Sequence, residues 1–287
     1  MQADAVVERW SRRLELFIPG FFHQSPALRE LWGHCGIIFH GSTTLGIDDD
    51  FSDLDLWVLS SLDAVRRAES TAGTRFFSFT LDGKQGHFNL EVADEFKRRV
   101  QHCDMERIAE LRRSRVLCDV EGKANALVSL AQQPMSDAIR LAWFKYHYIE
   151  MRGYHRNADN PIERGNAVAL LQALVPTLNH ALRAALVLDY EPYPYIKWLG
   201  HAAERTPTGQ RVMPLIKEVL DLLASDALRC GGPERSHPLS LKMREIRQLL
   251  IESAHAQGIT EPWLDRWWEH ITETADDIRK VNWEMTH

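Results

Sequence analysis

Gly41-Ser42 ends one apolar run, Gly36-Ile37-Ile38-Phe39-His40, and after ten further residues Asp53-Leu54-Asp55 opens another, Leu56-Trp57-Val58-Leu59. Short apolar runs bounded by turn residues predict buried strands. Side chains at positions i and i+2 of a strand point to the same face. Asp53 and Asp55 are therefore expected to present two carboxylates on one side of a sheet, with Leu54 turned into the core.

The two acids suit a site for divalent metal ions. Their Cα atoms are expected to lie roughly 6–7 Å apart, from the rise of a strand. Mg²⁺ takes oxygen ligands and is usually held by one or two carboxylates together with substrate phosphates. A pair of such ions stabilises both the attacking and the leaving oxygen of an in-line displacement. The acid pair therefore indicates transfer of a phosphoryl or nucleotidyl group.

The Gly-Ser turn suits the phosphates themselves. Gly41 has no side chain, so the backbone can approach a phosphate closely at this position. Ser42 offers a hydroxyl and an N–H group. The amides that open the following helical turn add a partial positive charge. Ser42 or Thr43 is also a plausible cap of that turn, so plain helix capping is the alternative interpretation of Ser42.

A third acid is expected from a neighbouring strand, and Glu91 in His87-Phe88-Asn89-Leu90-Glu91-Val92 is the best candidate. It would complete the metal site or accept the proton of an attacking hydroxyl. The alternative is an exposed acid on a strand. His40 and His87 either contact phosphate or are hydrogen-bonded histidines at strand ends. Asp48-Asp49-Asp50 is expected to be a charged surface loop rather than a cation site.

The order and spacing of these residues resemble the signature of the nucleotidyltransferase superfamily of the DNA polymerase β type. That signature has Gly followed by Gly or Ser, a gap similar to the one here, an acid pair around one apolar residue, and a later carboxylate on another strand. The resemblance implies Mg²⁺-dependent transfer of NMP from an NTP, by default AMP from ATP, to a hydroxyl group with release of pyrophosphate. Over residues 36–92 it implies phosphate binding by Gly41 and Ser42 and metal binding by Asp53, Asp55 and Glu91.

A second resemblance lies in Tyr190-Glu191-Pro192-Tyr193-Pro194-Tyr195-Ile196-Lys197-Trp198-Leu199, which is similar to the Tyr-Pro-x-x-Lys-Trp-Leu segment of bacterial aminoglycoside-type nucleotidyltransferases. Those proteins carry a helical C-terminal domain that closes over the nucleotide. The resemblance implies that Lys197 reaches the triphosphate, where a positive charge helps pyrophosphate to depart. Otherwise the Pro-rich loop packs Tyr193 and Trp198 between helices.

The distribution of strand and helix signals predicts an α+β fold. A small mixed-sheet nucleotidyltransferase domain is expected over 1–125 and an all-α helical-bundle domain over 126–287, with the active cleft between them. Asp82-Gly83 marks a hairpin, and Pro19-Gly20 is expected to end the first helix. Strands are expected at 36–40, 54–59, 76–81, 88–92 and 115–118. Helices are expected at 4–17, 62–72, 137–151, 167–188, 211–224, 239–255 and 262–282, with helical segments over 94–113.

The composition is typical of soluble globular proteins, with 287 residues, 45% hydrophobic residues and a formal net charge of −6. The acidic balance disfavours non-specific nucleic-acid binding, which relies on a basic surface. The first residues lack the pattern of a signal peptide, and no segment approaches the ~20 apolar residues of a membrane span. Four distant cysteines without a C-x-x-C pair favour a reducing cytoplasm over a disulfide framework.

Three functions are compatible with these features. A nucleotidyltransferase that modifies a small molecule such as an antibiotic is favoured by the acidic balance and the helical second half. An enzyme that modifies tRNA or a protein hydroxyl would need the basic segment 97–115 to line the cleft, rather than to pair with acids on helix surfaces. A nucleotide-binding module without turnover is disfavoured by the intact acids. Apolar residues at helical spacing are expected to form a core or interface stripe rather than a base-stacking platform. They are Trp263, Trp267, Trp268 and Ile271.

Overall fold

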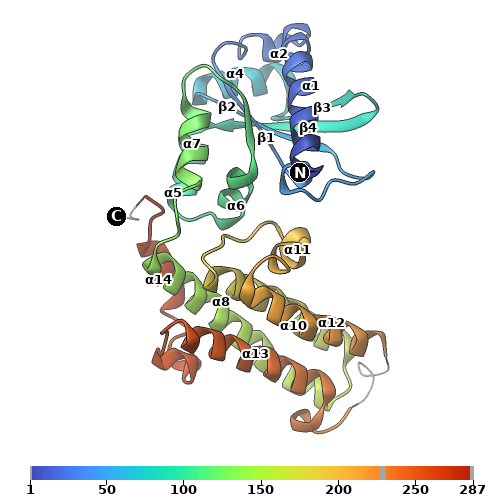
Figure 1. Cartoon of the computed structure of the whole chain (residues 1–287), viewed down its shortest axis with the longest axis vertical. Helices are drawn as coiled ribbons and strands as arrows, with labels where there is room; N and C mark the ends of the chain where they lie inside the picture. The colour runs from blue at the N-terminus through green and yellow to red at the C-terminus, as the bar shows by residue number, and fades with distance from the viewer. Residues whose placement is uncertain (1, 226–230, 285–287) are drawn as a thin grey trace. The chain divides into compact units, whose positions relative to one another are not determined.

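The structure is a computed structural model that describes residues 2–225 and 231–284. The chain divides into two compact units, Met1–Gln133 and Pro134–His287, and Figure 1 shows the sheet of the first and the helices of the second. The boundary expected after residue 125 falls inside helix α7 (Lys123–Ala131). This helix packs on the sheet, so the first unit extends to its end.

The first unit is built around a mixed sheet of five strands. Their bounds are β1 (Gly36–His40), β2 (Leu54–Ser60), β3 (Phe76–Leu81), β4 (Lys84–Val92) and β5 (Arg115–Asp119). In space they follow the order β3-β4-β2-β1-β5, in which β2 is parallel to β4 and every other neighbouring pair is antiparallel. All of the expected strands are therefore confirmed, and the expected hairpin joins β3 to β4.

One face of the sheet carries the main core of the first unit. It packs against α1 (Gln2–Gln24), α2 (Pro26–Arg29) and α4 (Leu62–Ala72), which lie on the same side of the strands in Figure 1. Alternate residues of the central strands, such as Ile37 and Leu56, are fully buried there. The apolar positions of the strands thus determine which face turns inward.

The opposite face packs against a second group of helices, α5 (Ala93–Gln101), α6 (Met105–Arg113) and α7. Trp57 of β2 contacts Phe96 of α5 on this side, with ring centroids 4.8 Å apart. Because side chains alternate along a strand, this face also receives Asp55.

The structure contradicts one local expectation in the first unit and makes another more specific. The first helix continues through Pro19 to Gln24, because Ile18 and Phe22 are buried in the core on either side of the proline. The stretch 94–113, expected to hold helical segments, forms two helices, α5 and α6. Cys103 interrupts it with a φ of +59°, and Asp104 then caps α6.

The second unit is helical throughout its described part, as expected. The helix expected over 262–282 is wrong. Trp263 lies in one 3-10 turn, Trp267 and Trp268 lie in another, and a short final helix follows. Among the described helices of the chain, none is long and apolar enough to cross a bilayer. The helix bounds are α8 (Asp137–Asn157), α9 (Asp159–Glu163), α10 (Ala167–Leu188), α11 (Leu199–Ala203), α12 (Pro207–Ala224), α13 (Pro238–Ala256) and α14 (Thr274–Lys280).

Three histidines are buried among these helices in their neutral form. Burial lowers the pKa of His155 and of His180 to about 4, helped by nearby arginines, and burial beside His180 lowers the pKa of His147 well below its usual value. His147 and His180 share one hydrogen bond, with their Nδ1 atoms 2.9 Å apart. Two neutral rings, one donating and one accepting, satisfy this geometry.

The free energy of unfolding is therefore expected to fall as the pH drops from about 6.5 to about 4. In this range the unfolded chain binds protons that the folded chain excludes from His155 and His180. The loss is at most about 3 kcal/mol for each histidine. Urea unfolding at a series of pH values measures it, and His180→Gln is expected to flatten the slope. A free energy of unfolding that stays constant over this range would contradict the prediction.

Candidate metal centre

The ends of three strands meet at one end of the sheet. β1 finishes at His40, while β2 and β4 begin close to Asp55 and His87. The register places His40 opposite Asp55 on one side, and His87 opposite Asp55 on the other. Residues directly opposite one another on adjacent strands share a face. The three side chains therefore form a row on the face that lies away from the main core.

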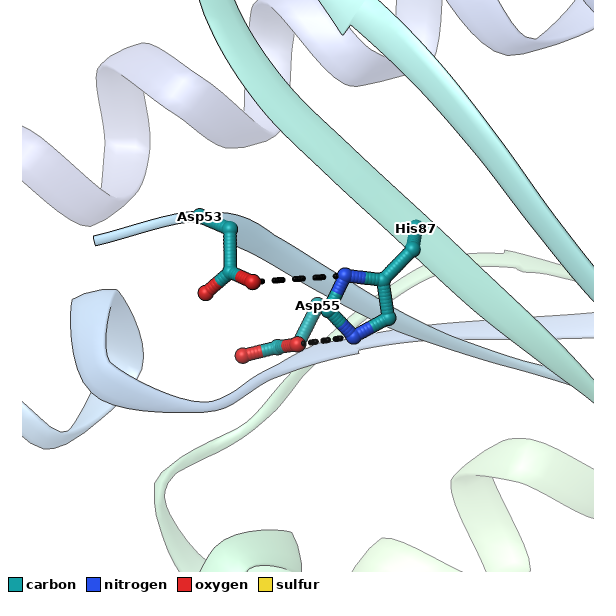
Figure 2. A group of neighbouring side chains, drawn as sticks. All are labelled: Asp53, Asp55 and His87. Carbon is teal, nitrogen blue, oxygen red and sulfur yellow. Dashed lines mark ion pairs between the residues drawn. The ribbon is translucent and has the colours of Figure 1, made fainter. Parts of the chain in front are cut away.

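Asp53, Asp55 and His87 converge at this end of the sheet (Figure 2). His87 Nδ1 lies 3.3 Å from Asp53 Oδ2, and His87 Nε2 lies 2.7 Å from Asp55 Oδ1. One ligand atom from each residue lies within 4.8 Å of those from the other two. The side chains keep some exposure, from 18% for Asp55 to 42% for Asp53. The trio thus offers two carboxylates and an imidazole nitrogen to a single cation.

Gly41 lies directly against this group. Its φ of +88° and ψ of −158° belong to a region that is essentially restricted to glycine. A Cβ atom at this position would lie 2.2 Å from Asp55 Oδ2 and 2.9 Å from Asp55 Cγ. The backbone therefore passes the Asp55 carboxylate more closely than any other residue permits.

The short helix α3 (Ser42–Leu45) follows Gly41, and no side chain caps it. The cap expected from Ser42 or Thr43 is therefore wrong, because Thr43 Oγ1 instead donates to Asp48 Oδ1 at 2.9 Å. Asp48 also forms an ion pair with Lys84 of β4. These contacts engage the first acid of the 48–50 loop and hold the chain between α3 and Asp53.

His40 has its own partners on the sheet. Its ring stacks on Trp57 with centroids 3.7 Å apart, and its Nδ1 lies 3.1 Å from Glu110 Oε2 on α6. The His40 and Glu110 side chains are only 12% and 17% exposed. These contacts support the interpretation of His40 as a strand-end histidine rather than a phosphate contact.

Glu91 lies farther along the same face. It is opposite Leu59, whereas His87 is opposite Asp55, so Glu91 is about 13 Å along the strand from the acid pair. Its carboxylate oxygens lie 3.9 Å from Arg99 Nη1 and 4.0 Å from Arg107 Nη2. The structure does not bring Glu91 to the group that Asp53 and Asp55 form.

His87 is the residue that takes the place expected for the third acid. Strand alternation already puts His87 on the same face as Glu91. Choosing between them requires the register of β4 against β2, two strands that are separated in sequence by α4 and β3. A parallel register of this kind leaves no local signal in either strand. The sequence alone therefore does not show which of the two residues lies beside the acid pair.

Lys197 belongs to the second unit, in the 3-10 turn η1 (Ile196–Trp198). It is exposed, and its Nζ atom lies 5.0 Å from the centroid of the Trp198 ring. Tyr193 of the same segment is buried, and the centroid of its ring lies 6.0 Å from that of the Trp143 ring. The Pro-rich segment therefore packs one tyrosine into the helical unit and leaves the lysine at its surface.

The imidazole of His87 should influence which ion the centre prefers. Carboxylates suit Mg²⁺ and Mn²⁺ alike, whereas an imidazole ligand favours a transition metal. We expect His87→Ala to weaken Mn²⁺ binding about tenfold and to change Mg²⁺ binding little. Titration of Mn²⁺ by electron paramagnetic resonance, with Mg²⁺ as the competitor, measures both affinities. An equal loss for the two ions would show that His87 only positions the carboxylates.

No protein-family model matches this chain, and no curated protein is significantly similar to it in sequence. Among solved structures, it is similar to that of a nucleotidyltransferase-like protein from Exiguobacterium sibiricum. The two chains are 12% identical, the match covers 93% of this chain and 89% of the other, and the TM-score is 0.48. At this identity and TM-score, the similarity carries no information about activity or substrate.

Proposed function

We propose that this protein is a metal-dependent nucleotidyltransferase. It would move NMP, by default AMP from ATP, to a hydroxyl of a small molecule such as an antibiotic. The acceptor oxygen bonds to the α-phosphorus, the bond from that phosphorus to the β-phosphate oxygen breaks, and pyrophosphate leaves with the electron pair. The hydroxyl proton passes to a base. The observation that carries the proposal is the convergence of Asp53, Asp55 and His87 within 4.8 Å beside the Gly41 turn.

The donor set fits a divalent cation. Asp53 and Asp55 supply the oxygens that suit Mg²⁺ and Mn²⁺ alike, and the His87 nitrogen favours a transition metal such as Mn²⁺. Such an ion would neutralise phosphate charge and orient the triphosphate. The half-exposed carboxylate of Asp53 leaves the group accessible to a substrate.

Gly41 and Ser42 are proposed to bind the triphosphate through backbone amides. Gly41 lets the chain pass close to Asp55, so an anion on these amides would sit beside the metal ligands. Lys197 is proposed to add a positive charge, which its exposed position leaves available. Each of these groups stabilises negative charge that grows as pyrophosphate departs.

A small-molecule acceptor is favoured over RNA by the state of the basic segment 97–115. Arg107 Nη1 pairs with Asp104 at 2.6 Å, and Arg98 lies 3.9 Å from Glu95. Arg112 donates to two backbone carbonyls near the end of α7. These guanidinium groups are engaged within the first unit, which supports the expectation of pairing on helix surfaces.

The cytoplasm is the proposed location. Cys35, Cys103 and Cys118 are free thiols, which suits a reducing compartment. The fourth cysteine, Cys230, lies outside the described residues.

Labelling with each radioactive NTP tests the proposed function. The protein is incubated with Mg²⁺ or Mn²⁺ and with aminoglycosides, lincosamides, tRNA or whole-cell protein as acceptors. We expect label from ATP on a small molecule, and none with Asp53→Asn. Label on tRNA or protein alone would mean that the acceptor is a macromolecule, while the proposed nucleotidyl transfer would stand. If no acceptor is labelled while NTP still binds, the chain is a binding module.

Glu91 offers a second test of which carboxylates take part. Glu91→Gln is expected to change kcat/KM for nucleotidyl transfer less than about threefold, because its charge lies far from the acid pair and is screened by Arg99 and Arg107. Steady-state kinetics with the identified acceptor measure this. A loss of kcat/KM as large as that of an Asp53 variant would show that Glu91 takes part in catalysis.

A further inference from the structure

The helical unit contains a cavity of about 550 Å³ that lies outside the proposed metal centre. It is lined by α8, α9, α13 and the 3-10 turns that begin at Glu234 and Trp267. Its volume falls within the range of small-molecule sites. Five arginines line it, namely Arg152, Arg156, Arg235, Arg244 and Arg247.

The arginines that line the cavity outnumber its acidic residues. The lining includes two carboxylates, Asp159 and Glu234. Glu234 accepts two hydrogen bonds from Arg244 Nη2, at 2.6 and 2.7 Å, and Asp159 lies 3.5 Å from Arg156 Nε. Both acids are therefore already engaged with one arginine each.

Among the described residues, Arg152 and Arg247 form no ion pair with an acid of the cavity, and each has a buried guanidinium nitrogen without a hydrogen-bond partner. In both residues this nitrogen is Nε. Burial and the neighbouring charges of Arg152 and Arg244 lower the pKa of Arg247. Leaving guanidinium N–H groups buried and unpaired costs free energy. Both residues line the cavity, so an anion there would supply the negative charge that these two guanidinium groups lack nearby.

Aromatic surface lies beside these charges. Arg152 sits over the Trp267 ring, with its Cζ atom 5.4 Å from the centroid. Trp268 meets Trp267 edge-on at 6.4 Å and is 56% exposed. The stripe expected from the sequence is thus split, because Trp267 packs inward while Trp268 presents a ring at the cavity. A flat heterocycle can stack on such a ring.

We propose that this cavity binds a free nucleoside phosphate, with its phosphates on Arg152 and Arg247 and its base against Trp268. Arginine forks match phosphate oxygens bidentately, which explains the gathering of guanidinium groups. The small volume of the cavity and its two acids suit a small anion better than a continuous RNA backbone. The site lies in a different unit from Asp53 and Asp55, and it needs no metal.

Calorimetric titration of the full chain in EDTA tests this site, because chelation removes the metal that the Asp53–Asp55 centre requires. ADP and pyrophosphate are the probes, with adenosine and a single-stranded RNA oligonucleotide as comparisons. We expect ADP to bind most tightly, pyrophosphate to bind more weakly and adenosine to bind weakest. Arg247→Met is expected to weaken ADP binding at least about tenfold. It should not reduce stability, since it removes a repelled charge.

Arg279→Ala is the matched control, because Arg279 lies on α14, is exposed and pairs with Asp276. It makes the same change in net charge and is expected to leave ADP affinity unchanged. Arg152→Met provides an independent second variant. The proposal is overturned if ADP gives no binding at about 1 mM, if Arg247→Met and Arg279→Ala bind ADP equally, or if RNA binds more tightly than ADP. None of these outcomes bears on nucleotidyl transfer at Asp53 and Asp55.

Discussion

Asp55→Asn is expected to lower kcat/KM for nucleotidyl transfer by at least about 10³-fold. Asn keeps the shape of the side chain and its place on β2, but it removes the charge and one anionic ligand atom. Asp55 contacts both His87 and Gly41: its carboxylate lies 2.7 Å from His87 Nε2 and directly against the Gly41 backbone. Steady-state kinetics at saturating metal measure the loss, and Mn²⁺ titration shows whether metal binding falls with it.

Asp50→Asn is the matched control for this variant. Asp50 is exposed in the loop that precedes Asp53, so its loss makes the same change in charge close to the same site. We expect its kcat/KM to stay within about threefold of the parent. If Asp50→Asn and Asp55→Asn lose activity equally, activity depends on the overall negative charge of this region. The proposal of a specific metal centre would then be wrong. If neither loses activity, the chemistry lies elsewhere.

The sequence predicted the fold of the first unit well because its strands are encoded locally. Apolar runs with clear ends, such as 36–40 and 76–81, need no partner to be recognised, and the structure has both with these bounds. The turn at Asp82-Gly83 was equally local, since both residues have positive φ. The same alternation that buries Leu54 and Leu56 turns Asp55 to the other face.

Two differences between expectation and structure have another physical cause, because each depends on packing between distant segments. Pro19 stays within a helix since Ile18 and Phe22 are buried against the sheet. His87 rather than Glu91 joins the acid pair because β4 lies parallel to β2 in one particular register. Periodicity describes one element at a time, so it cannot supply either fact.

Gly41→Ala is expected to damage both the stability and the activity of the protein. The new Cβ atom would meet Asp55 Oδ2 at 2.2 Å, and the backbone at φ +88° and ψ −158° is itself strained for alanine. Such a conformation costs about 1–3 kcal/mol. Displacement of the Asp55 carboxylate by about 1 Å would add a loss of about 100-fold in kcat/KM. Thermal unfolding and steady-state kinetics measure the two effects separately.

Gly73→Ala separates these two causes. Gly73 follows α4 with a φ of +73°, and a Cβ atom there would meet nothing within 4 Å. It therefore tests the backbone cost of a positive φ in the same unit without a clash against the carboxylate. We expect Gly73→Ala to lose about 1 kcal/mol of stability and to keep its activity. Equal activity in the two variants would mean that the close approach of Gly41 to Asp55 matters for stability and not for catalysis.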